Sequence, residues 1–308
     1  MKLPILPLLA LIAALSVGLF AGLFAVPLAA QDAAPPAAEN GDTIIVTGQG
    51  ERVTVAQTQR QARDIAVRQG NVFEVPLARF EDRLCPGVIG LTAEMAAMMI
   101  DRVRANARML DVRVQDDGCQ ANFILVFTED GGTMLRQLMD NNPSYFQYLS
   151  QGQKNDILEP GPVHVWTSVE PRTLTGMPIQ QVRDMTRPPV VNMVGVNSLI
   201  ATSTRRDITA VMVTFDTAAV RDLSVGQLAD YATMRGLAQT RPAGGLAIDS
   251  ILSLFEATDT PPNRLTDFDV AYLRALYAGN ANLPAAMKLS SVGSTLRGMT
   301  QVGSETGE

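Results

Sequence analysis

The segment Phe123-Ile-Leu-Val-Phe-Thr128 is an uninterrupted apolar run in the interior of the chain. Such a run is typical of a strand buried on both faces, because neither face then requires polar side chains. Thr92–Leu110 before it and Thr133–Asp140 after it show helical spacing of apolar residues. The apolar side of the first helix is predicted to carry Met95, Met98, Met99, Val103 and Ala107. A buried strand between amphipathic helices predicts the α/β (α+β) class, with a mixed twisted sheet and packed helices.

Further strands are expected on both sides of this unit. Thr43–Thr47 and Val163–Val169 are rich in β-branched residues, and alternation in the second places His164 and Trp166 on the same face. Val55–Gln69 carries arginines and glutamines at helical spacing and predicts a helix.

A hairpin is expected in the second half of the chain. Asn197–Ser203 and Ile208–Phe215 are its predicted strands, and Thr204–Asp207 is its charged tip. The Thr92–Leu110 helix has arginines that are predicted to form its solvated face, because arginines on amphipathic helices usually point to water, and an anion-binding patch is the alternative. These residues are Arg102, Arg104 and Arg108.

The first 30 residues decide the expected compartment. Lys2 is followed by a long apolar stretch, and no further charge occurs until Asp32. A positive start and the small residues Ala29–Ala30 predict an export signal over residues 1–30. The apolar run also exceeds the roughly 20 residues that cross a bilayer, so an uncleaved anchor is the alternative. Both interpretations place the rest of the chain outside the cytoplasm, and the expected location is periplasmic or secreted.

Composition divides the remaining chain further. Residues 31–42 are rich in proline, alanine and acidic residues and predict a disordered linker. A single α+β domain is expected over residues 43–288, with a candidate internal boundary near 150–162, where the sequence is loop-like. Residues 289–308 are rich in serine, glycine and threonine and predict a flexible tail.

Cys85 and Cys119 are the two cysteines of the chain. In an oxidising compartment an even count predicts a disulfide, and a reactive thiol pair would more usually show C-x-x-C spacing. Closing a loop of about 35 residues stabilises the fold by roughly 3–4 kcal/mol in the chain-entropy model.

The composition excludes several classes of function. The chain contains a single histidine, His164, so no site built from two or three histidines can form within it. The formal net charge is −6 and there are no lysine-rich runs, which makes nucleic acid an unsuitable partner. The sequence has no phosphate-binding loop, dinucleotide motif or G-x-S-x-G elbow, and no cofactor is expected. A membrane is expected to be a partner only through the N-terminal segment, if that segment is not cleaved.

Two helices with strong start signals end the domain. Ser224-Val-Gly-Gln227 and Thr266-Asp-Phe-Asp269 fit the capping-box pattern, and Gly279 supplies a helix stop. Leu265-Thr-Asp-Phe-Asp-Val-Ala-Tyr-Leu-Arg-Ala-Leu-Tyr277 resembles the closing helix of the matrixin-type metzincin zinc proteases, in which an Asp-led helix ends in Leu-Tyr-Gly. Ser250-Ile-Leu-Ser-Leu-Phe255 is similar to the segment that carries the methionine turn of this family, but it contains no methionine. The resemblance covers roughly residues 207–279.

The resemblance also implies where the zinc motif of the family, H-E-x-x-H-x-x-G-x-x-H, would lie. Gly236 matches the glycine, the acidic position holds Asp230, and none of the three histidine positions holds a good zinc ligand. A catalytic zinc needs about three protein ligands and an open position for water. The resemblance therefore implies a secreted bacterial pseudoenzyme, with a metzincin-like scaffold and no metal site. The degenerate positions are Ala229, Asp230, Thr233, Gly236 and Gln239.

The preferred hypothesis is a non-catalytic exported protein that binds a peptide, a protein or an envelope component. Metzincins pair substrate with an exposed edge strand, and the resemblance assigns this strand to Ile208, Val211, Val213 and Phe215. The alternative is a metal-independent hydrolase of the cell envelope that uses paired carboxylates, for which the sequence offers Asp207, Asp216, Asp230 and Glu170. A purely structural envelope component is a third hypothesis.

Overall fold

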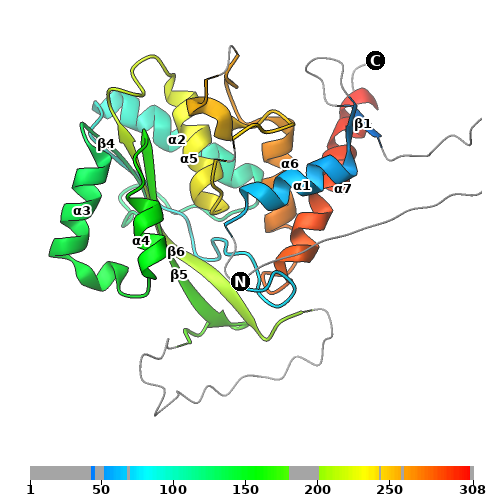
Figure 1. Ribbon diagram of the computed structural model, residues 1–308, viewed down its shortest axis with the longest axis horizontal. Coiled ribbons are helices and arrows are strands. Elements are labelled where there is room, and N and C mark those ends of the chain that lie inside the picture. The colour runs from blue at the N-terminus through cyan, green and yellow to red at the C-terminus, as the bar shows by residue number, and fades with distance from the viewer. Residues whose placement is uncertain are drawn as a thin grey trace, which may run out of the picture. The chain divides into compact units, whose positions relative to one another are not determined.

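The computed structural model describes residues 43–45, 52–67, 70–179, 201–242, 244–257 and 260–305. These residues form seven α-helices packed on a four-strand mixed sheet (Figure 1). All of these elements belong to one compact unit, Gly41–Glu308. The fold is therefore mixed α/β, and the predicted class is confirmed.

The central sheet has the strand order β3-β4-β6-β5. Its strands are β3 (Pro86–Ile89), β4 (Phe123–Thr128), β5 (Val163–Thr173) and β6 (Thr204–Asp216). β3, β4 and β6 are parallel, and β5 runs antiparallel to β6. The apolar run that predicts a buried strand is β4, which lies between β3 and β6 with Phe123 opposite Val211.

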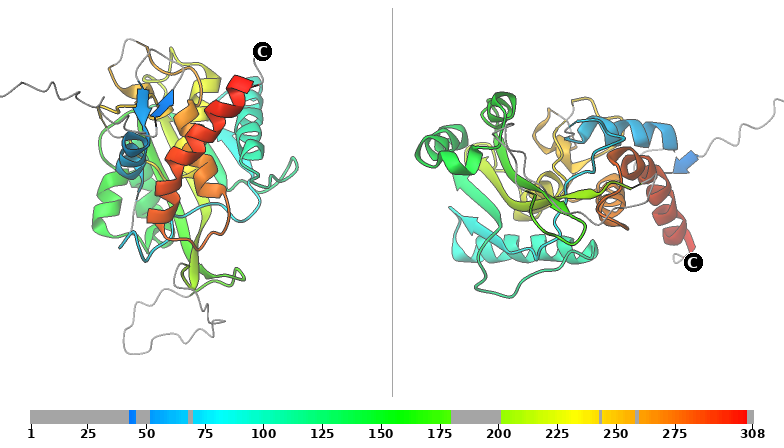
Figure 2. Two further views of the ribbon diagram at one scale, coloured as in Figure 1. Left: turned by 90° about the vertical axis from the view of Figure 1, so that its right-hand side faces the viewer. Right: turned by 90° about the horizontal axis from the view of Figure 1, so that it is seen from below.

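Helices cover the sheet on both faces (Figure 2). On one face, α2 (Ala93–Met109), α5 (Val225–Leu237) and α6 (Asp267–Tyr277) contribute to the main hydrophobic core. On the other face, α3 (Gly131–Asn141) and α4 (Gln151–Ile157) enclose a smaller apolar cluster. The buried members of that cluster are Leu135, Phe146, Ile157 and Trp166, and Phe146 lies in the 3-10 turn Pro143–Phe146.

The remaining elements come from the two ends of the described chain. β1 (Thr43–Ile45) and β2 (Arg52–Thr54) form a separate antiparallel pair. α1 (Val55–Ile65) follows β2, and α7 (Ala285–Glu305) packs against both α1 and α6. The predicted helix Val55–Gln69 is present over Val55–Ile65, and the described part of the predicted strand Thr43–Thr47 is β1.

Two segments that the sequence presents as irregular are helical. α4 occupies part of the candidate boundary near 150–162, because Ser150 begins it with a capping box. The expectation of a flexible tail over residues 289–308 is wrong for its described part, which belongs to α7. Leu289, Val292 and Leu296 are buried there in the main core. A small-residue composition therefore conceals a regular apolar stripe along this helix.

The predicted hairpin is also corrected. Thr204–Asp207 is not a turn but the first part of β6, and β6 pairs with β5 over its whole length. Most of the proposed partner strand Asn197–Ser203 lies outside the described residues. The charged side chains of this segment form ion pairs within the sheet, as Asp207 does with Arg205 and Arg172, so their presence does not indicate a turn.

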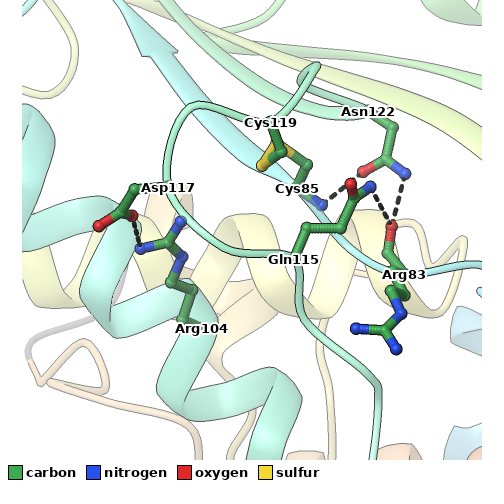
Figure 3. Close-up of a disulfide and its surroundings, with 7 residues drawn as sticks. All are labelled: Arg83, Cys85, Arg104, Gln115, Asp117, Cys119 and Asn122. Carbon is green, nitrogen blue, oxygen red and sulfur yellow. Dashed lines mark hydrogen bonds and ion pairs between the residues drawn. A yellow bond between two sulfur atoms is a disulfide. The ribbon is translucent and has the colours of Figure 1, made fainter.

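Cys85 and Cys119 form the predicted disulfide, with their Cα atoms 6.1 Å apart (Figure 3). Cys85 directly precedes β3, and Cys119 lies in the loop that leads to β4. Asn122 accepts the Cys85 backbone N–H at 2.8 Å and donates to the carbonyl of Arg83. The disulfide joins the loop between α2 and β4 to the residue before β3. It is consistent with an oxidising compartment.

Candidate functional site

Helix α5 carries the degenerate zinc-motif positions, and its local sequence explains where it begins and ends. Ser224 accepts the backbone N–H of Gln227, and the Gln227 side chain accepts the Ser224 N–H in return. The helix ends at Leu237, and Gln239 beyond it has a φ of +46°. Gly236 lets α5 lie close to β4, since a Cβ at this position would be 2.5 Å from Cε2 of Phe123.

The motif positions on α5 lie in close-packed interior. Ala229, Asp230 and Thr233 have no exposed surface. The Thr233 hydroxyl donates to the Ala229 carbonyl and accepts from Nδ2 of Asn106 on α2. Gly236 contacts the sheet, and Gln239 lies beyond the end of the helix. The structure therefore does not arrange these positions around an open site.

Asp230 is the centre of a hydrogen-bond cluster between α2, α5 and the segment before α6. Its carboxylate accepts Nε and Nη2 of Arg102, each at 2.7 Å, and Nδ2 of Asn106 at 2.7 Å. It also accepts the backbone N–H of Leu265 at 3.0 Å. A carboxylate has about four acceptor positions, so these four donors use its full capacity. Asp230 is a structural anchor in this geometry and has no acceptor position left for a substrate proton.

Of the arginines predicted to be solvated, Arg104 is only 13 % exposed and pairs with Asp117, whereas Arg102 stays partly solvated and also binds Asp230. The Arg102 side chain is 41 % exposed, and its hydrogen bonds to Asp230 raise the pKa of the guanidinium above its ordinary value. Met95 and Met98, predicted to be apolar-face residues, are exposed instead. The buried stripe of α2 consists of Met99, Val103, Asn106 and Ala107 and faces α5 as well as the sheet.

Arg102 and Asn106 are site residues that sequence reasoning missed. Asn106 falls in register with Met99 and Val103 on the buried side of α2. A polar residue in an apolar stripe requires a buried hydrogen-bond partner, so this register is a usable signal. The partner itself, Asp230, lies 124 residues later and could not be identified by spacing.

The predicted edge strand is in the interior of the sheet. β6 lies between β4 and β5, and the four residues assigned to substrate pairing are completely buried. They are Ile208, Val211, Val213 and Phe215. The assignment is wrong because the antiparallel strand that precedes β6 pairs on its outer side. The edge strands of this sheet, as described, are β3 and β5.

The outer edge of β5 offers unpaired backbone groups. Asp216 donates its N–H to the carbonyl of Pro162, at 3.0 Å. Because hydrogen-bonded pairs alternate along an antiparallel ladder, the N–H groups of Val163, Val165 and Thr167 point away from β6. None of these three N–H groups has an acceptor among the described residues. A strand added at this edge would satisfy them.

The only histidine is packed against the start of α3. His164 is 5 % exposed, and its Nδ1 donates to the carbonyl of Ile157 at the end of α4, at 2.9 Å. A Cβ at Gly131 would lie 3.0 Å from His164 Cδ2 and 2.8 Å from Thr214 Cγ2. The glycine therefore permits α3 to approach the sheet, and His164 helps to hold α4 there. His164 and Trp166 share the α3–α4 face, as predicted.

The other candidate carboxylates are engaged by neighbours of opposite charge or by backbone groups. Asp207 is fully buried, lies 2.9 Å from Arg205 and 3.5 Å from Arg172, and has its pKa raised by burial. Glu170 pairs with Arg172. Asp216 accepts the N–H of Gly131 at the start of α3. Asp207, Asp230 and Asp216 thus hold different elements in place.

The segment that resembles a methionine turn is linked to the closing helix. Asp269 on α6 is fully buried and accepts the Ser250 hydroxyl at 2.6 Å and the Ile251 N–H at 2.8 Å. Both the backbone N–H and the hydroxyl of Thr266 also donate to it. Burial raises the pKa of this carboxyl to about 6. Asp269 therefore fixes the 3-10 turn Ile251–Phe255 against the start of α6.

The described residues contain no group of three or more histidine, cysteine, aspartate or glutamate side chains that could hold a metal ion. Within the same residues, no helix has the length and apolar character needed to cross a bilayer. The predicted signal or anchor over residues 1–30 and the linker over residues 31–42 lie outside the described part of the chain.

The chain was compared with protein-family models, curated proteins and solved structures. None of the three comparisons finds a match.

Proposed function

We propose that this chain is an exported, non-catalytic binding protein that receives an extended peptide segment along the outer edge of β5. The observation that carries this proposal is the row of outward N–H groups at Val163, Val165 and Thr167. Strand addition satisfies such groups with main-chain hydrogen bonds and needs neither a metal nor a cofactor. These residues offer a stretch that accommodates about five residues of an added strand, roughly 17 Å long.

The chemistry of the edge supports a binding role. Natural edge strands are usually protected from pairing by charged side chains, prolines or bulges. Val163–Val169 contains no Asp, Glu, Lys or Arg. Protection begins only at the end of this segment, with the bulge between Ser168 and Val169, and continues at residues 177–179, which bond back onto the end of β5. The unprotected part of β5 is therefore limited to its first five residues.

Side chains on the two faces of β5 would give such a peptide its specificity. Val163 and Val165 are half-buried and pack against the main core. Trp166 lies on the opposite face beside Tyr145, with ring centroids 6.3 Å apart, and Tyr145 is 62 % exposed. Since side chains of an added strand alternate between faces, a peptide with apolar or aromatic residues at alternate positions is the expected occupant.

The non-catalytic part of the proposal rests on the saturation of Asp230. A general base needs a free acceptor position within reach of the proton it removes. All four acceptor positions of Asp230 are used by Arg102, Asn106 and Leu265. Asp269 has a structural role of the same kind, because it binds the turn at Ser250 to the start of α6.

The peptide-binding proposal is tested by changing the edge without changing the sheet. Val165→Pro removes one outward N–H and leaves the ladder to β6 intact, because proline is tolerated where the N–H faces away from the sheet. Val165→Thr keeps the N–H and is the matched control. We expect peptides that wild-type protein selects from a phage-displayed library of seven-residue sequences to bind Val165→Pro about tenfold more weakly and Val165→Thr with unchanged affinity.

Hydrogen exchange gives a second measurement on the same complexes. Bound peptide should protect the amides of Val163, Val165 and Thr167 and leave those of α5 unchanged. If Val165→Pro fails to fold, Thr167→Lys replaces it, since a lysine at an edge discourages pairing. Equal binding to wild type and to the folded edge variant, or protection confined to another surface, would contradict the proposal.

The location and the absence of zinc chemistry are tested separately. Expression of the full chain in a bacterium should yield exported protein whose N-terminus is Gln31; a retained N-terminus would favour the anchor instead. Native mass spectrometry of metal-free protein titrated with zinc should show no tight stoichiometric binding. A tightly bound zinc ion would contradict the non-catalytic assignment.

A further inference from the structure

A hollow lies where the first turn of α5 meets α2 and the segment before α6. Its volume is about 370 Å³, within the roughly 300–1,000 Å³ of small-molecule sites. Two apolar side chains and two arginines contribute to the lining, which includes no acidic residue. The lining residues are Met98, Arg102, Val225, Gly226, Asn263 and Arg264.

Asp230 holds two walls of this hollow in fixed positions. Its carboxylate binds Nε and Nη2 of Arg102 on α2, and it also binds the N–H of Leu265, the residue after Arg264. The Arg102 side chain remains 41 % exposed. Its third nitrogen, Nη1, has no partner among the described residues. Because Asp230 already holds this guanidinium in one orientation, donating to a ligand costs little further side-chain entropy.

The hollow holds one cation, Arg264, without an acidic partner among the described residues, because the charge of Arg102 beside it is compensated by Asp230. The protein carries a net charge of −6, yet the ionisable residues that line the hollow are both arginines, and Arg264 is exposed. The first turn of α5 adds the positive end of a helix dipole. Arginine is suited to carboxylates because its planar donors match the two oxygens. Met98 and Val225 supply apolar surface beside these cations.

We propose that this hollow binds a small organic carboxylate that carries a short apolar chain. The carboxylate contacts Arg264 and the free Nη1 of Arg102, and the apolar chain lies against Met98 and Val225. Asp230 acts as a positioning residue, which orients Arg102 and the loop of Arg264 without touching the ligand. This site is separate from the β5 edge and does not depend on peptide binding there.

The test uses hexanoate as the probe and the methionine methyl groups as reporters. In protein labelled with ¹³C at the methionine methyls, hexanoate should shift the Met98 signal in a saturable way, and the Met98→Leu variant identifies that signal. Met95 is an internal control, because it is exposed on the same helix and does not line the hollow. Hexanamide, which lacks the charge, and inorganic phosphate, which lacks the apolar chain, should each bind at least about tenfold more weakly.

Two variants separate a built site from a general charge effect. Arg264→Gln should weaken hexanoate binding about tenfold, since it removes one charged hydrogen-bond donor. Arg63→Gln on α1 makes the same charge change at an exposed position and should leave binding unchanged. The proposal is overturned if hexanoate leaves Met98 unshifted, if phosphate binds as tightly as hexanoate, or if the two variants behave alike.

Discussion

The α2–α5 interface and the outer edge of β5 differ in how their polar groups are satisfied. In the interface, Asp230 is fully buried and receives four hydrogen bonds from α2 and from the segment before α6. Along the edge, the N–H groups of Val163, Val165 and Thr167 find no acceptor among the described residues. The Asp230 carboxylate in the first region has no free acceptor position, whereas the second region keeps unpaired main-chain donors.

The difference shows what the resemblance leaves open: it singles out residue types on α5 but not the partners that those residues have in the fold. The metzincin pattern directs attention to α5, where an acidic residue occupies the general-base position. In the structure this acid, Asp230, is hydrogen-bonded to internal donors, and every motif position on the helix is buried. Strand addition requires main-chain groups that folding leaves unsatisfied, and among the described residues the outer edge of β5 has a row of them.

Removal of the Asp230 carboxylate should have the largest effect on stability. Asp230→Ala leaves Arg102, Asn106 and the Leu265 N–H without their shared acceptor. Arg102 is 41 % exposed and can be solvated, but the buried Asn106 amide and the Leu265 N–H lose their acceptor. An unsatisfied buried donor costs about 1–3 kcal/mol, and we expect a decrease of at least this size in the free energy of unfolding, measured by urea denaturation. Asp230→Asn keeps one acceptor oxygen and should cost less. An unchanged free energy of unfolding in Asp230→Ala would mean that the four hydrogen bonds to this carboxylate do not stabilise the α2–α5 interface.

The second buried, fully hydrogen-bonded carboxyl, that of Asp269, predicts a pH dependence of stability. Its pKa is raised from 3.8 in the unfolded chain to about 6 in the folded protein. Between pH 3.8 and about pH 6 the folded state therefore binds more protons than the unfolded chain. Protonation of Asp269 stabilises the fold fully below pH 3.8, and this stabilisation is lost as the pH rises through about 6. The slope approaches about 1.4 kcal/mol per pH unit in this window.

The measurement is the free energy of unfolding between about pH 4 and pH 7 for wild type and Asp269→Asn. The variant should lose the part of the slope that Asp269 contributes. Asp267→Asn, an exposed change on the same helix, should keep the wild-type slope. Parallel curves for wild type and Asp269→Asn would show that this carboxyl does not change its protonation on folding.

Gly236→Ala tests how tightly α5 packs on the sheet. The added Cβ would lie 2.5 Å from Cε2 of Phe123 and 3.0 Å from Cγ1 of Val211. Overpacking of this kind costs about 1–3 kcal/mol, although alanine favours the helix by up to about 1 kcal/mol. Gly298→Ala on α7 meets nothing within 4 Å and should stabilise the protein instead. Thermal unfolding of both variants compares them; a stabilised Gly236→Ala would indicate room beneath α5.

The sequence predicts local structure well where the signal is local. Phe123–Thr128 identifies the interior strand, the capping boxes at Ser224 and Thr266 mark two helix starts, and the disulfide follows from the cysteine count. These features depend on neighbouring residues and on compartment, so they need no tertiary information. α7 was missed because its serines and glycines hide an apolar stripe that only α1 and α6 make meaningful.

The candidate site was harder to predict because it depends on pairings between distant segments. Whether β5 or β6 lies at the edge is decided by which strand β4 pairs with, and the spacing of apolar residues carries no such information. The same applies to Asp230, whose role is set by Arg102 and Asn106 on another helix. Residue types alone indicate possible chemistry at α5, and the tertiary contacts show that the Asp230 carboxylate is occupied by Arg102, Asn106 and the Leu265 N–H.

The smallest expected effect concerns the outer edge of β5. Thr167→Lys places a charge on the β5 edge at a half-buried position whose N–H points away from the sheet. Because no internal hydrogen bond is lost there and the lysine stem can lie along apolar surface with its ammonium in water, the free energy of unfolding should fall by about 1 kcal/mol or less. Peptide pairing should nevertheless be lost, since a lysine opposes strand addition. A large loss of stability in urea denaturation would instead reveal that this edge is covered in the folded chain, and the distinction between the two regions would no longer hold.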